Sequence, residues 1–282
     1  PEEIICEPKA YLNELMMDDN SGQPSAKEVF DTTPYTILVV DDNPDMTDFL
    51  KRTFEGYFKR IIIAGDGVEA LQLVRSHVPD IIVSDVMMPR MNGYKLCKTI
   101  KEDINISHIP VILLTARDDR QSQISGYKNG ADGYLSKPFE VEMLMELIRN
   151  RLKNREYTKK RYLNAGLIPT PEESTISLTD ETFLIKLNSI IQENIENSNL
   201  GIQFICQEVG LGRSSLYNKL KALTGMGANE YISKLRIEKA ITLISGTDMP
   251  FSEIAEKTGF TTPSYFSTAF KQYTGETPSQ YK

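Results

Sequence analysis

The sequence predicts an α/β domain built on a doubly wound, five-stranded parallel sheet, followed by an all-helical domain. Between residues 35 and 153, short apolar runs alternate with segments of helical spacing, a pattern typical of parallel strands covered by helices on both faces. After residue 178 the apolar residues recur only at helical spacing. A chain of 282 residues is long enough for about two domains.

The apolar runs place the strands of the sheet. Strands are expected near 36–40, 59–63, 80–84, 110–114 and 132–135, each followed by a helical segment. The last of these helices runs from about residue 140 to 153, with continuation into the charged segment 155–161 as an alternative. Helix-breaking glycines and prolines then mark two segments outside the domains. We interpret residues 1–34 as a leader or linker and residues 154–177 as a connector, so that the second domain covers 178–282.

An internal repeat organises the helical domain. Ile205 and Gly210 recur as Ile254 and Gly259, at an offset of 49 residues. Each unit combines a short helix, a glycine that can adopt a left-handed carboxyl-terminal cap, and a second helix, which is helix-turn-helix spacing. A helix from about 228 to 245 joins the units. It would be roughly 27 Å long, near the ~34 Å between successive major-groove faces of B-DNA.

Composition limits the binding partners and the cellular compartment that we expect for the protein. The net charge is −7, and residues 1–34 hold 2 basic and 8 acidic side chains, so charge neither identifies nor excludes DNA binding by the later domain. Three widely spaced cysteines predict neither a disulfide framework nor a zinc site, which favours a reducing cytoplasm. No apolar stretch approaches the ~20 residues that span a bilayer, so we expect no membrane contact. His77 and His108 belong to no motif, and we interpret both as surface residues.

Polar side chains follow four of the predicted strands. Asp41 and Asp42 come after the first strand, Asp85 after the third, Thr115 after the fourth and Lys137 after the fifth. Because ligands of such sheets bind outside the carboxyl ends of the strands, we expect these side chains to meet at one point. Three carboxylates, a hydroxyl and an ammonium suit a divalent cation together with a phosphoryl group carried on a carboxylate.

Residues 35–153 resemble the receiver domain of bacterial two-component response regulators. The resemblance rests on Asp41-Asp42, on Asp85 within Ser-Asp-Val-Met-Met-Pro, and on Gly93, Thr115-Ala116 and Lys137-Pro138-Phe139. It implies a flavodoxin-like fold that accepts a phosphoryl group from a histidine kinase on Asp85. It also implies a Mg²⁺ ion held directly by Asp42 and Asp85, through water by Asp41, and by the backbone carbonyl of Met87.

The same resemblance assigns the remaining site residues. Lys137 is a point cation for the phosphoryl oxygens, and Thr115 hydrogen-bonds the phosphoryl group once it arrives. Tyr134 matches the aromatic switch position of the family, although a plain half-buried aromatic residue is an alternative interpretation. The peptide bond before Pro138 is expected to be cis.

Residues 178–282 resemble the AraC-type DNA-binding domain, which carries two helix-turn-helix units on a central helix. The matching segments are 216–225, 254–260, 263–267, 270–271 and 278–281. In such units the second helix enters the major groove and its early residues meet base edges. We expect Phe270 to face inward together with either Tyr265 or Phe266. Gly212 stands where a capping serine is usual, and Thr268 where a basic residue is frequent.

Two classes of DNA contact follow from the helical spacing. The candidates for reading bases are Ser214, Tyr217, Asn218, Ser264, Ser267 and Thr268. The candidates for phosphate contacts, which position a protein without reading sequence, are Arg213, Lys219, Lys221 and Lys271. For each polar residue, a solvated helix face is the alternative interpretation.

Together these patterns predict a non-enzymatic, phosphorylation-controlled transcription regulator that binds specific double-stranded DNA and forms a homodimer when phosphorylated. The order of domains also resembles the carboxyl-terminal part of hybrid two-component proteins, whose parent chain is anchored in the inner membrane. One alternative is a receiver-controlled helical adaptor that binds proteins. Another is an aspartate-nucleophile phosphatase, although Met87 stands where such enzymes carry their general acid.

Overall fold

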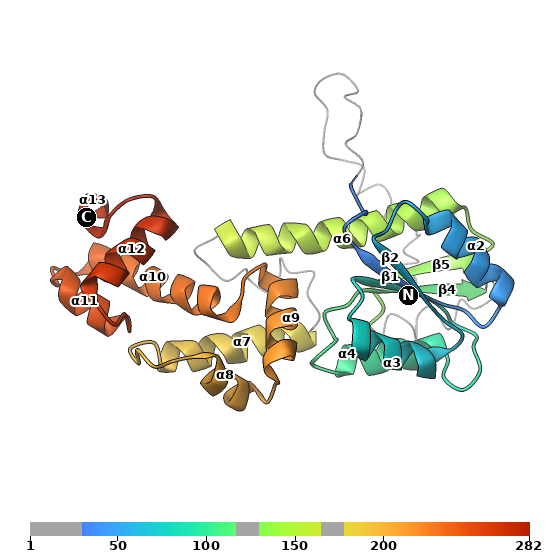
Figure 1. Ribbon diagram of the computed structural model, residues 1–282, viewed down its shortest axis with the longest axis horizontal. Helices are drawn as coiled ribbons and strands as arrows, with labels where there is room; N and C mark the ends of the chain where they lie inside the picture. The colour runs from blue at the N-terminus through green and yellow to red at the C-terminus, as the bar shows by residue number, and fades with distance from the viewer. Residues whose placement is uncertain (1–29, 117–129, 165–177) are drawn as a thin grey trace, which may run out of the picture. The chain divides into compact units, whose positions relative to one another are not determined.

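The computed structural model describes residues 30–116, 130–164 and 178–282 (Figure 1). Contacts gather Asp31–Lys282 into one compact unit. It comprises a sheet region (31–116 and 130–164) and a helical region (178–282), each with its own apolar clusters. The predicted leader, the segment 165–177 of the predicted connector, and the helix expected between the fourth and fifth strands lie outside the described residues.

Five parallel strands form one sheet with the order β2-β1-β3-β4-β5. The strands are β1 (Thr36–Val40), β2 (Arg60–Ala64), β3 (Ile81–Asp85), β4 (Val111–Ala116) and β5 (Gly133–Lys137). β1 and β3 are buried almost throughout, as expected of central parallel strands. The chain moves from β1 to one edge and then crosses back to the other, which confirms the predicted doubly wound sheet.

Helices cover both faces of this sheet. They are α2 (Pro44–Phe54), α3 (Gly67–His77), α4 (Gly93–Glu102) and α6 (Val141–Asn164). Figure 1 shows α2 and α6 on one face and α3 and α4 on the other. A side-chain oxygen caps the amino end of α2 from Asn43, of α3 from Asp66 and of α4 from Asn92. α6 runs eleven residues past 153, so the alternative with continuation through 155–161 is confirmed and the helix includes the first part of the predicted connector.

The helical region consists of helices only, within the residues that the structure describes. They are α7 (Leu178–Glu193), α8 (Ile202–Val209), α9 (Arg213–Thr224), α10 (Ala228–Gly246), α11 (Phe251–Lys257), α12 (Pro263–Thr274) and α13 (Pro278–Tyr281). The pairs α8–α9 and α11–α12 form the two predicted helix-turn-helix units, and α10 joins them. Gly210 and Gly259 both adopt φ +72°, which confirms the predicted left-handed glycines. None of the helices in the described ranges is long and apolar enough to cross a membrane.

Two predictions about burial are settled by the structure. Phe266 is fully buried beside Phe270, whereas Tyr265 is 54% exposed, so the inward aromatic residue of α12 is Phe266. The expectation that His108 lies on the surface is wrong, because its side chain is buried. Burial, reinforced by the charges of Arg155 and Lys219, lowers the pKa of His108 to about 3. The imidazole is therefore uncharged at neutral pH.

The two repeat-related glycines differ in what surrounds them. A Cβ at Gly259 would clash with the carbonyl oxygen of Ile195 and with Arg236, whereas a Cβ at Gly210 would meet nothing within 4 Å. We expect Gly210→Ala to cost about 1–2 kcal/mol, the backbone penalty of a left-handed L-residue. Gly259→Ala adds overlap with backbone and should lower the free energy of unfolding by more. Urea denaturation of both variants measures the difference, and equal losses would contradict this account.

Candidate phosphoryl site and nucleic-acid interface

One ammonium group joins two carboxylates at the carboxyl edge of the sheet. Lys137, the last residue of β5, places its Nζ 2.6 Å from Oδ1 of Asp85 and 2.9 Å from Oδ2 of Asp41. Both aspartates are buried, while the lysine side chain is 28% exposed. Partial burial opposes the lysine charge, but the bonds and charges of Asp85 and Asp41 outweigh it and raise the pKa of Lys137. The predicted meeting of these three side chains is therefore present in the structure.

Backbone amides hold the two carboxylates in place. Oδ2 of Asp85 accepts a hydrogen bond of 2.8 Å from the amide of Met87, and Oδ1 of Asp41 accepts one of 2.9 Å from the amide of Asn43. Each aspartate thus has one oxygen bonded to the chain that follows it and the other paired with the lysine. The carboxylates are fixed in orientation before any ligand arrives.

Thr115 contributes a buried hydroxyl to the same edge. It lies in β4 opposite Ser136 of β5, one position before the pair formed by Ala116 and Lys137. The residue is fully buried, and its Oγ1 has no hydrogen-bond partner among the described residues. A buried polar atom without a partner costs free energy. The site therefore offers a hydrogen-bond donor to a ligand at the sheet edge.

The acidic residues fit a magnesium site in chemistry, but they do not form a cage by themselves. Asp42 is exposed to solvent beside the buried Asp41. In the described parts of the chain, no three His, Cys, Asp or Glu side chains come close enough to hold a metal ion together. Mg²⁺ usually takes one or two carboxylates and completes its shell with water and phosphate oxygens. Asp42, Asp85 and the Met87 carbonyl are donors of that kind.

Gly93, at the start of α4, lies against the backbone of the phosphoacceptor candidate. Its amide donates a 3.0 Å hydrogen bond to the carbonyl of Val86, and a Cβ here would clash with the carbonyl oxygen of Asp85. Tyr134 is half-buried and packs against the apolar cluster beneath α3 and α4, a position that suits both the switch and the plain aromatic interpretation. The peptide bond before Pro138 is cis, as predicted.

The amino-terminal half of α9 presents the predicted DNA-contacting residues of the first unit. Arg213, Ser214, Tyr217 and Asn218 are exposed, and they line one continuous hollow on the surface. Leu216, Leu220 and Leu223 on the opposite side of α9 are buried in the core of the helical region. The helix therefore has one packed face and one open polar face.

α12 is arranged in the same way in the second unit. Thr262 caps its amino end by accepting a hydrogen bond from the amide of Tyr265. Ser264, Thr268 and Lys271 are exposed, whereas Ser267 is half-buried. The sequence reasoning missed Tyr265, which stands exposed at the amino end of α12 with its ring edge-on to Phe260 at 5.8 Å. Like Tyr217 of α9, it is an exposed aromatic residue in the first half of its helix.

Lys219 departs from its predicted role in this structure. Its side chain is fully buried and forms an ion pair with Asp180 of α7, so in this conformation it cannot reach a DNA phosphate. The sequence spacing already indicates burial of this side chain. Lys219 lies three residues after Leu216 and four before Leu223, so it falls on the buried stripe of α9. Lys221, two residues further on, is exposed as predicted.

Comparison with known proteins decides the family. The sequence model of the response regulator receiver domain matches residues 37–149, and that of a helix-turn-helix domain matches 205–282. The response regulator MprA of Mycobacterium sp. (strain KMS) is 36% identical over 165 residues, which cover 54% of this chain and 70% of that protein. The chain belongs to the response regulators. Its output domain is of the AraC type, so the regulator combines a receiver with a DNA-binding domain.

Two further relatives show how far the similarity extends. Histidine kinase P4 of Formosa agariphila is 41% identical over 247 residues, which cover 88% of this response regulator but 18% of the kinase. The chain thus spans less than a fifth of that relative. The solved receiver domain of the Francisella response regulator 1452 is 38% identical, with 43% of this chain and 98% of that chain covered and a TM-score of 0.39.

The unpartnered hydroxyl of Thr115 predicts an unusual response to mutation. Thr115→Val removes no hydrogen bond among the described residues, so the free energy of unfolding should stay unchanged or rise by up to about 1 kcal/mol. Thr47→Val is the matched control in the same region, because Thr47 Oγ1 donates a 2.9 Å bond to the carbonyl of Pro44. That variant should lose about 0.5–1.5 kcal/mol. Urea denaturation compares the two, and a larger loss at Thr115 would refute the assignment.

Proposed function

We propose that this response regulator receives a phosphoryl group on Asp85 from a histidine kinase and binds specific double-stranded DNA in response. The observation that carries the proposal is the ion pairing of one lysine, Lys137, with both Asp85 and Asp41. A cation held at the nucleophile offsets the charge that a phosphoryl group brings. The unpartnered hydroxyl of Thr115 supplies a donor to one of its oxygens.

The transfer uses the carboxylate of Asp85 as the nucleophile. An oxygen of Asp85 forms a bond to phosphorus, and the bond from phosphorus to the imidazole nitrogen of the kinase histidine breaks. The leaving nitrogen keeps the electron pair. Mg²⁺, held by Asp42, Asp85 and the Met87 carbonyl and through water by Asp41, would neutralise charge on the transferring group. No general acid stands at Met87, two residues after the nucleophile, which favours a persistent acyl phosphate over phosphatase turnover.

The reading of DNA falls to the open faces of α9 and α12. Ser214, Tyr217 and Asn218 are placed to meet bases from the first unit, with Ser264, Ser267 and Thr268 placed likewise in the second. Arg213, Lys221 and Lys271 would contact phosphates. With so few cations on these faces, pairing of two phosphorylated protomers on a repeated site would raise affinity through effective concentration. A DNA-binding regulator of this kind acts in the cytoplasm.

The kinase relative favours a hybrid parent chain for this regulator. The similarity to the histidine kinase of Formosa agariphila covers 88% of this chain, and therefore parts of both the receiver and the helical region. A segment similar to this regulator is thus part of a polypeptide that is named a histidine kinase. We propose the same arrangement here, with the phosphoryl group passed within one chain or between two copies. Sequencing the complete reading frame tests this directly, and a frame without a kinase domain would contradict it.

The phosphoacceptor can be tested by mass. Incubation with acetyl phosphate and Mg²⁺ should add one phosphoryl group to the protein, and Asp85→Asn should abolish the adduct because an amide oxygen is a poor nucleophile. Asp48→Asn makes the same chemical change on the exposed face of α2 and should leave the adduct intact. An adduct that survives in Asp85→Asn would move the phosphoacceptor elsewhere.

The phosphate contacts can be tested through the salt dependence of DNA binding. Arg213→Ala should weaken binding to a random-sequence duplex and reduce the slope of log K against log salt by about 0.9, the share of one phosphate contact. Lys51→Ala removes a positive charge from exposed α2 of the sheet region and should leave the slope unchanged. Fluorescence anisotropy across a salt series measures both. If wild-type protein binds no duplex at low salt, the protein-binding adaptor becomes the better interpretation.

A further inference from the structure

A buried polar cluster joins the first DNA-contacting helix to the receiver. Lys219 of α9 forms its ion pair with Asp180 of α7 and donates a 2.7 Å hydrogen bond to Oγ of Ser107. Ser107 in turn donates a 2.7 Å hydrogen bond to Oδ1 of Asp180. Ser107 belongs to the loop between α4 and β4 of the sheet region, whereas the other two residues belong to the helical region. The three side chains therefore form a closed triangle across the two regions.

The receiver completes the shell of this ion pair. Lys219 and Ser107 are fully buried, and Asp180 is 2% exposed. An ammonium has three donors, and besides Asp180 it finds the Ser107 hydroxyl and the ring of Phe183, 5.1 Å from its centroid. Burial lowers the pKa of Lys219, while the Asp180 carboxylate opposes that change. Buried ion pairs are stable only when further hydrogen bonds satisfy the charged groups, and here the receiver supplies one.

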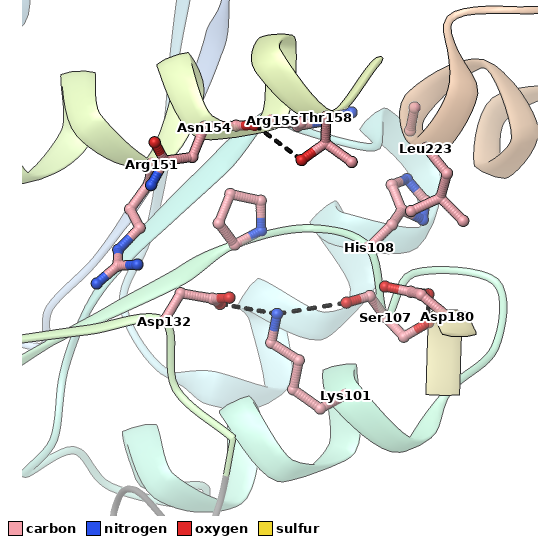
Figure 2. A pocket seen from close by; sticks show the side chains of 12 residues that line it. Lys101, Ser107, His108, Asp132, Arg151, Asn154, Arg155, Thr158, Asp180 and Leu223 are labelled. Atoms are coloured by element: carbon pink, nitrogen blue, oxygen red, sulfur yellow. Dashed lines mark hydrogen bonds and ion pairs between the residues drawn. The ribbon is translucent and has the colours of Figure 1, made fainter. Parts of the chain in front are cut away.

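Neighbouring contacts extend the same junction. Ile104 of the α4–β4 loop packs against the apolar cluster of the helical region. Thr179 of α7 donates a 3.1 Å hydrogen bond to the carbonyl of Lys101 at the end of α4. Figure 2 shows the Lys101 ammonium between Asp132 and Ser107. Its Nζ lies 2.7 Å from the Asp132 carboxylate and donates to the carbonyl oxygens of Ser107 and Ile109. These contacts of Lys101 fix the position of the loop that carries Ser107.

From these contacts we propose that Lys219 is a phosphate-contacting residue that the receiver keeps away from DNA. The hydroxyl of Ser107 holds the ammonium of Lys219 in the buried cluster, and we call this contact the latch. The inference rests on the proposed DNA-binding function. Lys219 lies on the packed side of α9, next to Asn218 of the open polar face, and its ammonium is held in the buried cluster. Separation of the two regions removes the Ser107 hydroxyl and opens the cluster to water. The ammonium then leaves a poorly solvated site and becomes available to a DNA phosphate.

The latch lies on a route that begins at the phosphoryl site. β5 carries Lys137 at its carboxyl end, and Asp132 directly precedes its amino end. Asp132 holds Lys101, and Lys101 holds the carbonyl of Ser107. Asp132 also accepts a 2.7 Å hydrogen bond from the amide of Val111 at the start of β4, the strand that carries Thr115. A shift of β4 or β5 on phosphorylation would therefore act on the loop that holds the latch.

Lysine reactivity tests the latch without any DNA. In the full chain, acetylation by a limiting amine-reactive ester should modify Lys219 roughly 10- to 1000-fold more slowly than Lys221, because a minor open state of 0.1–10% would limit the reaction. Lys221 is exposed two residues away on the same helix, so it serves as an internal reference. Mass spectrometry of the digested protein gives both rates. Equal rates in the unphosphorylated protein would overturn the proposal.

Variants on the receiver side separate the latch from the ion pair within the helical region. Ser107→Arg places a second positive charge against Lys219 and should raise its reactivity towards that of Lys221. Ser107→Ala removes only the hydroxyl and should act in the same direction by a smaller factor. Gln72→Arg adds the same charge on exposed α3 and should change nothing. If both Ser107 variants retain full protection while folded by circular dichroism, Asp180 alone holds Lys219 and the latch is refuted.

Beryllofluoride, a mimic of the phosphoryl group, tests the coupling. With Mg²⁺ it should release Lys219 in the wild-type chain and have no effect in Asp85→Asn. Protection that persists in wild-type protein with beryllofluoride bound at Asp85 would refute control by the receiver. In parallel, Ser107→Arg should bind a random-sequence duplex with a salt slope steeper by about 0.9 than the unphosphorylated wild type. If reactivity changes as expected but no form binds DNA, the latch stands and the proposed DNA-binding function fails.

Discussion

Parallel pairing of the five strands is the constraint on which the phosphoryl site depends. It brings the carboxyl ends of β1, β3, β4 and β5 to one edge, so that residues far apart in the chain become neighbours. Asp41 and Asp85 would repel each other there without a cation. Lys137 supplies that cation from the end of β5, at 2.6 Å and 2.9 Å from the two carboxylates. Because β1, β3 and β4 are buried almost throughout, their register, and with it the geometry of the site, is strongly specified.

The charged cluster around Lys137 and the one around Lys219 differ in their exposure to solvent. At the sheet edge, Lys137 remains partly exposed and the cluster stays accessible to a ligand. In the cluster around Lys219, the charges are sealed and a neutral hydroxyl completes their shell. The first arrangement suits a site at which charge arrives. The second suits a contact whose stability depends on the fit of two regions, since a buried ion pair gains little unless all its bonds are made.

The two helix-turn-helix units are related by sequence but are not equivalent in the structure. α9 begins after Gly212 without a side-chain cap, while α12 begins with a capping Thr262. α9 carries Lys219 into the junction with the receiver, whereas α12 has the uncharged Ala269 at the corresponding distance from its start. The first unit is therefore the one whose surroundings depend on the receiver. Such an arrangement lets phosphorylation act on part of the DNA interface.

Local patterns in the chain were sufficient for the strands, the helix-turn-helix units, the left-handed Gly210 and Gly259, and the group formed by Asp41, Asp85 and Lys137. Each of these depends on apolar periodicity or on backbone preferences that a short segment expresses by itself. The burial of Lys219 and His108, the exposure of Tyr265, and the triangle with Ser107 depended on contacts across more than a hundred positions or on the packing of neighbouring helices. The spacing indicates that Lys219 lies on the packed side of α9, but a lysine is buried there only if a partner satisfies its charge. Only the packing of the receiver loop against α7 and α9 supplies that partner.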